Sequence, residues 1–344
     1  MIKKTIALAA LATVAAAGAA EARDQIRIVG SSTVYPFSTT VAENFGRSTE
    51  FSTPIVESTG TGGGMKLFCA GVGTENPDFT GASRRMKVTE LENCFGNGVD
   101  NVTEMKIGYD GIVIANDKTG PDMEVSREQL WLALAAEVPV DGKLVENPYT
   151  KWSDISGDLP DTEIEVLGPP PTSGTRDAFV ELVMEEGCEG PLEGIELSKD
   201  EHKATCATMR EDGAFVEAGE NDNLIVQKLQ ANKNAFGIFG FSFLEQNSDA
   251  LKGSVVDGEQ PTYENIASGA YPVSRSMYFY VKNAHVGTIP GMEAFVAEFT
   301  SPRAWGPDGY LVDKGLIAMD EAEREEYREK AMNLTPITMD DLKK

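Results

Sequence analysis

Four short segments combine small hydroxyl residues with glycine or arginine, and each follows an apolar run or stands where a helix can begin. They are Gly30–Thr33, Thr59–Gly64, Gly81–Arg84 and Thr172–Arg176. Free N–H groups at the start of helices, together with hydroxyl and guanidinium groups, form binding sites for oxyanions. None of the four segments pairs a nucleophile with a base. The pattern therefore favours an anion-binding protein over an enzyme.

Three of these segments also have ordinary structural explanations, which the sequence leaves open. A Ser-Ser-Thr sequence is typical of a helix cap, a glycine-rich stretch is typical of a turn, and Arg84 is typical of a surface salt bridge in an acidic chain. The glycine-rich segment also lacks the lysine and hydroxyl residue that end a nucleotide-binding P-loop. Thr172–Arg176 is the strongest signal, because its hydroxyls and amides would cap a helix while Arg176 supplies positive charge.

Enzymatic and metal chemistry lack their usual residues. A serine nucleophile needs an adjacent base, but His202 and His285 are isolated and no Ser-x-x-Lys pattern occurs. No pair of cysteines has C-x-x-C spacing, so a zinc site is not expected. We expect no enzymatic activity, no metal and no cofactor.

Residues 1–22 are expected to form a cleaved export signal. Lys3 and Lys4 precede an apolar run over 5–20, and residues 20–22 have the small-x-small pattern of a cleavage site. All four cysteines lie in the exported part, which points to disulfide bonds. Three pairings are possible. If the chain forms two lobes, as we expect from the strand pattern described below, Cys69–Cys94 and Cys188–Cys206 each close a short loop within one lobe, and we expect these two pairs.

The chain is strongly acidic. Its formal net charge is −25, and removal of residues 1–22 leaves 28 basic and 54 acidic residues, a net charge of −26. A field of that sign disfavours binding to nucleic acid or to an anionic membrane. An anion must be captured against this field, which requires a local, shielded site.

Apolar strand-like runs alternate with helical patterns, which predicts an α/β fold with a mainly parallel sheet and helices on both faces. Two strong strands, Tyr109–Ala115 and Met277–Val281, bracket a middle segment with strand–helix units of its own. They are either core strands of one sheet or, as we expect, the two crossovers of a hinge. In that case residues 23–112 and 275–344 form the first lobe and 113–274 form the second.

Taken together, the motifs resemble those of the periplasmic phosphate-binding proteins of Pst-type ABC transporters. The similar segments keep the same order through essentially the whole mature chain. They are GSSTVYPF (30–37), GTGGGMK (60–66), GASR (81–84), TKWSD (150–154), TSGTR (172–176) and FGIFGF (236–241).

The resemblance implies a two-lobe Venus-flytrap fold of the type II-like kind, in a monomeric periplasmic protein. Such a protein holds inorganic phosphate between its lobes and delivers it to the permease subunits of an ABC transporter at the inner membrane. Carried over by position, the phosphate ligands are Ser32, Thr33, the backbone at Val34, Thr61, Ser83, Arg84, Ser173, Gly174, Thr175 and Arg176.

Two positions depart from the family pattern. Many members have an aspartate where this chain has Arg84, and that aspartate accepts the proton of hydrogen phosphate and so rejects sulfate. Many also have an arginine where this chain has Pro169. Positive charge is thus expected at Arg84 and Arg176, and Asp110 is a candidate for the missing acceptor. The alternatives are a binding protein for another oxyanion such as sulfate, an extracellular interaction protein and a phosphoester hydrolase on the same fold.

Overall fold

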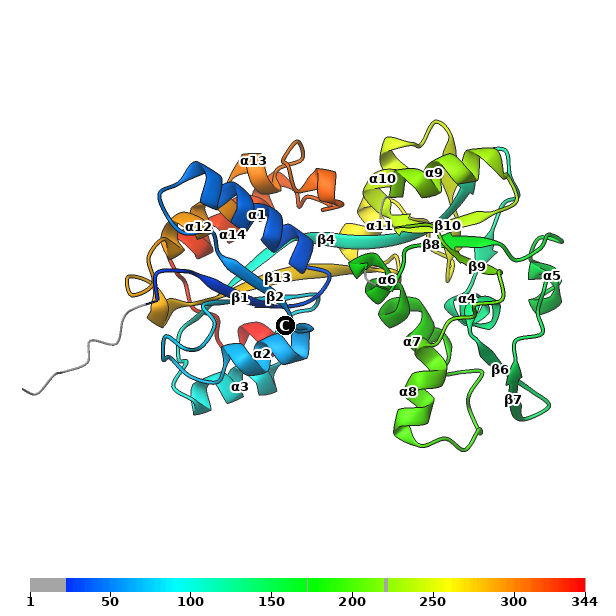
Figure 1. Ribbon diagram of the computed structural model, residues 1–344, viewed down its shortest axis with the longest axis horizontal. Coiled ribbons are helices and arrows are strands. Elements are labelled where there is room, and N and C mark those ends of the chain that lie inside the picture. Colours follow the sequence, from blue (N-terminus) through cyan, green and yellow to red (C-terminus); the bar gives the residue numbers. More distant parts are fainter. Residues whose placement is uncertain (1–22, 172, 220–221, 344) are drawn as a thin grey trace, which may run out of the picture.

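The computed structural model describes residues 23–171, 173–219 and 222–343. The expected export signal and Thr172 lie outside these residues. Figure 1 shows two α/β lobes side by side, with the long strand β4 (Val102–Asp117) running from one into the other. No helix of the described ranges combines the length and the apolar character that crossing a membrane requires.

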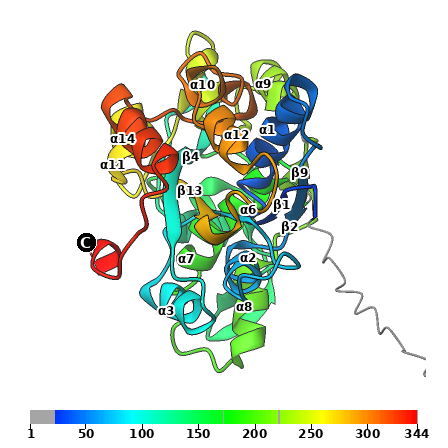
Figure 2. The ribbon, with the colours of Figure 1, turned by 90° about the vertical axis from the view of Figure 1, so that its left-hand side faces the viewer.

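The first lobe is a mixed sheet between two layers of helices. Its strand order is β2-β1-β3-β13-β4, with β1 parallel to β2 and β3 and with β13 antiparallel to β3 and β4. Helices α1, α12 and α14 cover one face and α2 and α3 the other (Figure 2). The bounds are β1 Arg27–Gly30, β2 Ile55–Ser58, β3 Phe79–Ala82, β13 Ser274–Lys282, α1 Tyr35–Ser48, α2 Thr61–Phe68, α3 Val88–Gly96, α12 Met292–Phe299, α13 Pro302–Trp305, α14 Glu321–Met332 and the short turns η2 Asn283–His285, η3 Val312–Lys314 and η4 Asp341–Lys343.

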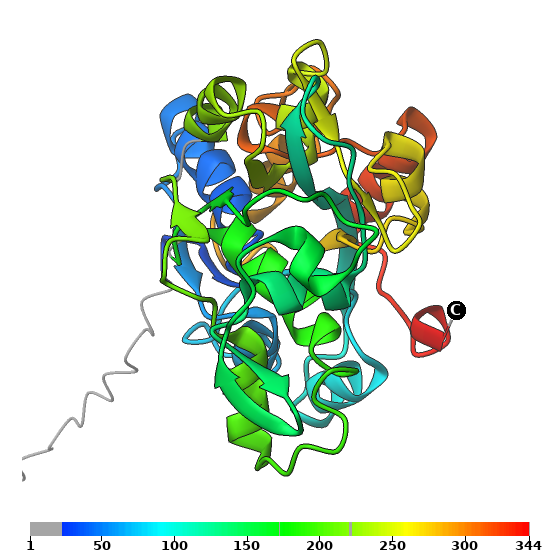
Figure 3. The same ribbon diagram turned by 90° about the vertical axis from the view of Figure 1, so that its right-hand side faces the viewer.

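The second lobe repeats this layered arrangement around the order β4-β10-β8-β9, with β11 also paired to β4. Helices α9 and α10 lie above the strands, and α4, α7 and α8 lie below them (Figures 1 and 3). The bounds are β8 Val166–Gly168, β9 Phe215–Glu217, β10 Phe236–Gly240, β11 Leu251–Gly253, the paired β5 Glu124–Val125 and β12 Val255–Val256, the hairpin β6 Glu137–Val140 and β7 Lys143–Glu146, α4 Arg127–Leu134, α5 Trp152–Ile155, α6 Gly174–Phe179, the π-helical turn η1 Val180–Met184, α7 Glu185–Gly187, α8 Lys199–Ala207, α9 Asp222–Ala231, α10 Phe241–Gln246 and α11 Tyr263–Ser268.

Strand β4 changes partners in its middle. Its first part, up to Gly111, pairs with β13, and from Ile112 onward it pairs with β10 and β11. One continuous strand therefore belongs to both sheets, and β13 begins at the same level and returns into the first lobe. The expectation of a two-lobe α/β fold with two crossover strands is confirmed.

Apolar residues at positions 34, 37, 41 and 45 have helical spacing, which predicts a helix there, and the structure confirms it as α1. Phe37, Val41 and Phe45 of α1 are at most 4% exposed, and Phe45 meets the ring of Phe295 edge-on with their centroids 5.5 Å apart. Spacing of three and four residues puts these side chains on one helix face, which explains why the pattern predicted the helix. Both expected disulfides, Cys69–Cys94 and Cys188–Cys206, are also confirmed.

Gly64 allows α2 to lie directly against β1. A Cβ atom at this position would lie 2.5 Å from Cα of Gly30 and 2.7 Å from Oγ1 of Thr80. In the same helix a Cβ atom at Gly62 would meet nothing within 4 Å. Close packing of two backbones therefore explains one glycine of the glycine-rich segment, whereas Gly62 faces open space.

We expect Gly64→Ala to lower the free energy of unfolding by roughly 1–3 kcal/mol, because backbone atoms must move apart to admit the methyl group. Gly62→Ala is the matched control and should raise the free energy of unfolding by about 0.5–1 kcal/mol, since alanine favours the helix. Urea unfolding of the two variants measures both effects. Equal stabilities would contradict the packing role of Gly64.

Candidate functional site

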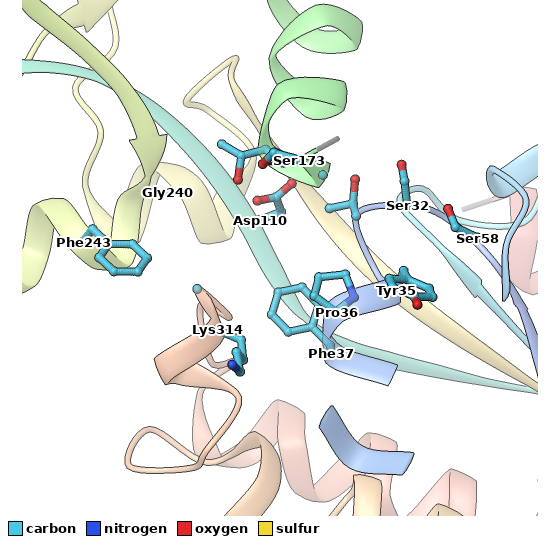
Figure 4. Close-up of a pocket in the computed structure, with 14 residues that line it drawn as sticks. Ser32, Tyr35, Pro36, Phe37, Ser58, Asp110, Ser173, Gly240, Phe243 and Lys314 are labelled. Atoms are coloured by element: carbon cyan, nitrogen blue, oxygen red, sulfur yellow. Dashed lines mark hydrogen bonds between the residues drawn. The ribbon is translucent and has the colours of Figure 1, made fainter. Parts of the chain in front are cut away.

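A cavity of about 400 Å³ lies between the lobes where the crossover strands pass. Its lining comes from both lobes and from β4, and it is rich in hydroxyl groups (Figure 4). The residues that line it are Ser32, Thr33, Tyr35, Pro36, Phe37, Ser58, Asp110, Ser173, Gly174, Thr175, Gly240, Phe243, Lys314 and Gly315. Five of the sequence-predicted site residues, Ser32, Thr33, Ser173, Gly174 and Thr175, thus meet around one space.

The wall from the first lobe is the loop between β1 and α1. Ser31 folds back on this loop: its hydroxyl accepts the N–H of Thr33 at 3.2 Å and its carbonyl accepts the N–H of Tyr35 at 2.9 Å. Among the described residues, no acceptor reaches the N–H groups of Ser32 and Val34. The start of α1 therefore keeps free donors beside the cavity. The side chain of Val34 itself is 1% exposed and packs into the core.

The wall from the second lobe is the N-terminus of α6. The hydroxyl of Ser173 caps the helix by accepting the N–H of Thr175 at 3.2 Å. The helical segment continues through η1 and α7 to Gly187, so several turns of aligned peptides stand behind this end. A Cβ atom on Gly174 would lie 3.1 Å from the carbonyl oxygen of Ser32. The two helix starts therefore touch each other across the lobes.

Two charged residues that face each other on the crossover strands complete the site. Asp110 of β4 and Arg275 of β13 are register partners, and their side chains are 13% and 8% exposed. Nε of Arg275 donates to Oδ2 of Asp110 at 3.4 Å, and Nη2 donates to Oγ1 of Thr33 at 2.7 Å. Burial raises the pKa of Asp110, while the charge of Arg275 acts in the opposite direction.

Sequence reasoning did not find Arg275. It lies just before the strong strand 277–281 and outside the six segments that carry the family resemblance. The only available signal was that Asp110 lies near the start of one expected crossover strand and Arg275 just before the other. Their pairing requires the antiparallel register of the two strands, which the sequence does not state. Asp110, named as a candidate acceptor, does line the cavity.

Thr61 and Ser83 lie together at the carboxyl end of β3 in the first lobe. Their hydroxyl oxygens are 3.0 Å apart, and the N–H of Ser83 donates to Oγ1 of Thr61 at 3.2 Å. This contact joins the start of α2 to the end of β3. The two hydroxyls engage each other rather than line the cavity, so their predicted contact with an anion stays a prediction.

The two arginines expected to carry the positive charge have other partners. Arg84 forms a bidentate salt bridge with Glu90 of α3, at 2.7 and 2.9 Å. Arg176 donates to the carbonyl of Pro169 at 3.2 Å and lies over the ring of Phe215. Neither lines the cavity, and burial lowers the pKa of Arg176. Contact of either guanidinium with an anion stays a prediction.

The cavity can thus offer many neutral donors and one carboxylate. Hydroxyls and free amides from two helix starts suit a small oxyanion, since each makes a directional hydrogen bond to an oxygen. The only acid and the only base among the described lining residues are Asp110 and Lys314. Asp110 would accept a hydrogen bond from an anion that still carries a proton.

Comparison with known proteins gives a consistent result. A model of the PBP superfamily domain matches residues 15–303. The protein SphX of Synechococcus elongatus is 29% identical over 259 residues, which is 73% of this chain and 66% of that protein. The phosphate-binding protein PstS of Staphylococcus saprophyticus is 28% identical over 321 residues, which is 92% of this chain and 86% of that protein.

A solved structure shares the fold and most of the chain. The crystal structure of a possible phosphate binding protein from Planctomyces limnophilus has a TM-score of 0.72 and 27% identity, and the match covers 90% of this chain and 98% of that one. The family model extends over much more than half of the sequence. The chain belongs to the PBP superfamily.

Proposed function

We propose that this protein captures inorganic phosphate, as the hydrogen phosphate dianion, between its lobes and delivers it to the permease of an ABC transporter. The observation that carries the proposal is the convergence of two helix starts, at Ser32–Thr33 and at Ser173–Thr175, on one cavity. The relatives named phosphate-binding protein and the Planctomyces limnophilus structure support the choice of ligand.

The lobes and the cellular location are part of the same proposal. Residues 23–112 with 275–344 make the first lobe and 113–274 the second, which is supported by the change of β4 partners between Gly111 and Ile112. Residues 1–22 direct export to the periplasm, where the two disulfides are stable. The protein works there as a monomeric receptor that meets the permease subunits at the inner membrane.

Capture couples binding to lobe closure. Hydrogen bonds to a charged group contribute roughly 1.5–3 kcal/mol each, so several donors reach the −8 kcal/mol or so that corresponds to micromolar affinity. Only the closed arrangement lets donors from both lobes contact one anion. Phosphate therefore shifts the population toward closure by its differential affinity for that state.

Asp110 supplies the selection between phosphate and sulfate. Hydrogen phosphate has an O–H group that can donate to the carboxylate, whereas sulfate has none near neutral pH. An ionised carboxylate would face an unprotonated sulfate oxygen, and that contact is repulsive. The carboxylate stands in the cavity lining on the crossover strand, although Arg84 occupies the position that resemblance assigns to an acidic residue.

Isothermal titration calorimetry of the mature protein tests the ligand. We expect phosphate to bind with an affinity of about 1 μM or tighter and to raise the melting temperature, with sulfate and molybdate much weaker. Absence of stabilisation by any oxyanion would favour an extracellular interaction protein. Turnover of a chromogenic phosphomonoester, lost in Ser173→Ala, would instead favour a hydrolase.

The variant Asp110→Asn tests the acceptor. An amide can donate to sulfate and carries no charge, so we expect the ratio of phosphate to sulfate affinity to fall by about tenfold or more. Asp122→Asn is the control, because its side chain is 98% exposed and lies outside the cavity lining. An unchanged ratio in Asp110→Asn would remove Asp110 from the selection mechanism.

Gly174→Ala tests closure. The added methyl group would press on the Ser32 carbonyl from the other lobe, and a hinged lobe can yield by opening slightly. We expect phosphate affinity to fall about three- to tenfold, as one strong hydrogen bond is lengthened, while the melting temperature without phosphate changes little. Small-angle scattering with saturating phosphate should show a less compact molecule. Wild-type affinity and compactness would refute the contact.

A further inference from the structure

Arg275 stands at the meeting point of both lobes and the hinge. It is the second residue of β13, opposite Asp110, and its side chain is nearly buried. Its guanidinium group contacts three different parts of the chain: Thr33 before α1, Asp110 on β4, and Glu181 in η1, whose Oε2 lies 2.5 Å from Nη1. Each of its three nitrogens therefore has an acceptor.

The contact with Thr33 fixes which way that hydroxyl can donate. A hydroxyl has one hydrogen and accepts through its lone pairs. Because Nη2 of Arg275 occupies the acceptor side, the hydrogen of Thr33 is left for another acceptor, and Thr33 lines the cavity. Arg275 therefore makes this hydroxyl a donor toward the cavity.

The contact with Asp110 has the complementary effect. Nε donates to Oδ2, and among the described residues no donor reaches Oδ1. Burial has the larger effect and raises the pKa of Asp110, and the adjacent charge of Arg275 partly offsets this rise, so Arg275 favours the ionised carboxylate. The charged groups that act on Asp110 are Arg275 from β13 and Glu181 from η1. One free acceptor atom thus remains on the cavity wall.

The contact with Glu181 ties this pair to the second lobe. Glu181 belongs to the same helical segment that begins at Ser173, so the end that carries Ser173–Thr175 and the contact to Arg275 move together. Arg275 continues on β13 into the first lobe. Opening of the lobes would separate Glu181 from Arg275.

We propose that Arg275 is a positioning residue that makes Thr33 a donor and Asp110 an ionised acceptor. Glu181 then makes these two roles depend on lobe closure, because it holds Arg275 from the second lobe. The inference rests on the proposed capture of phosphate. Anion selection is then completed only when the second lobe is in place. An anion bound to the first lobe alone meets a less fixed pair of partners.

Calorimetric titration with phosphate and with sulfate, at pH 6.5 and pH 8.5, tests the role of Arg275. We expect Arg275→Gln to weaken phosphate binding by about tenfold or more and to lower the phosphate-to-sulfate ratio. The ratio should recover in part at pH 8.5, relative to the unchanged protein, because Asp110 without its cation ionises only at higher pH. Arg275→Lys keeps the charge but not the three contacts, so it should retain more of the ratio than of the affinity.

Glu181→Gln and Glu185→Gln form a matched pair that tests the link to the second lobe. Both remove one negative charge from the same helical segment and the same neighbouring cavity, but only Glu181 contacts Arg275. If the loss of a nearby negative charge were the only effect, both variants would bind phosphate with the same affinity. We expect Glu181→Gln to bind phosphate about two- to fivefold more weakly than Glu185→Gln, the range of a partly exposed ion pair.

The outcomes separate this inference from the proposed function. If the unchanged protein does not bind phosphate, the proposed function fails and the inference with it. If it binds phosphate but Arg275→Gln keeps both the affinity and the ratio at both pH values, only the inference is overturned. Should Arg275→Gln fail to fold by circular dichroism, Arg275→Lys and the glutamate pair decide. Wild-type phosphate affinity in Arg275→Lys, together with equal affinities in Glu181→Gln and Glu185→Gln, would overturn the inference.

Discussion

The antiparallel pairing of β4 with β13 is the constraint on which the site depends. Backbone donors and acceptors along a buried strand must stay paired. The first part of the 16-residue strand β4 therefore pairs with β13, and the rest pairs with β10 and β11. This ladder fixes the level at which the lobes meet. It also sets Asp110 opposite Arg275, whose guanidinium group contacts both Asp110 and Thr33 of the loop before α1.

A strongly acidic chain must bind an anion without help from its net charge. The structure meets this with fixed neutral dipoles: hydroxyls and amides at two helix starts, brought together where the lobes touch. Within each lobe, these groups are oriented by the backbone of a helix start before an anion arrives. Arg275 is held by two acidic partners, Asp110 and Glu181, so it acts through the residues it orients rather than as an exposed positive patch.

Two other arginines, Arg84 and Arg85, also pair with carboxylates of this acidic chain. Arg84 pairs with Glu90, which fastens the loop after β3 to the start of α3, and Arg85 pairs with the buried Glu104. Helix α14 is tied to the first-lobe sheet in a similar way, since Glu323 accepts from Lys106 and from Tyr109 on β4. These contacts join the helices and strands of the first lobe to one another.

The sequence by itself determined the elements and the chemistry of the helix starts. Periodicity gave α1, local spacing gave the two disulfides, and the order of strands and helices gave two lobes, because these signals are local or additive along the chain. It also marked Ser32, Thr33 and Ser173–Thr175, because hydroxyls and free N–H groups at the start of a helix can bind an anion. Only the tertiary structure decided the partners of the charged groups. A guanidinium group takes the nearest carboxylate in space, and the pairing of Arg275 with Asp110 depends on the register of strands 165 positions apart in the chain.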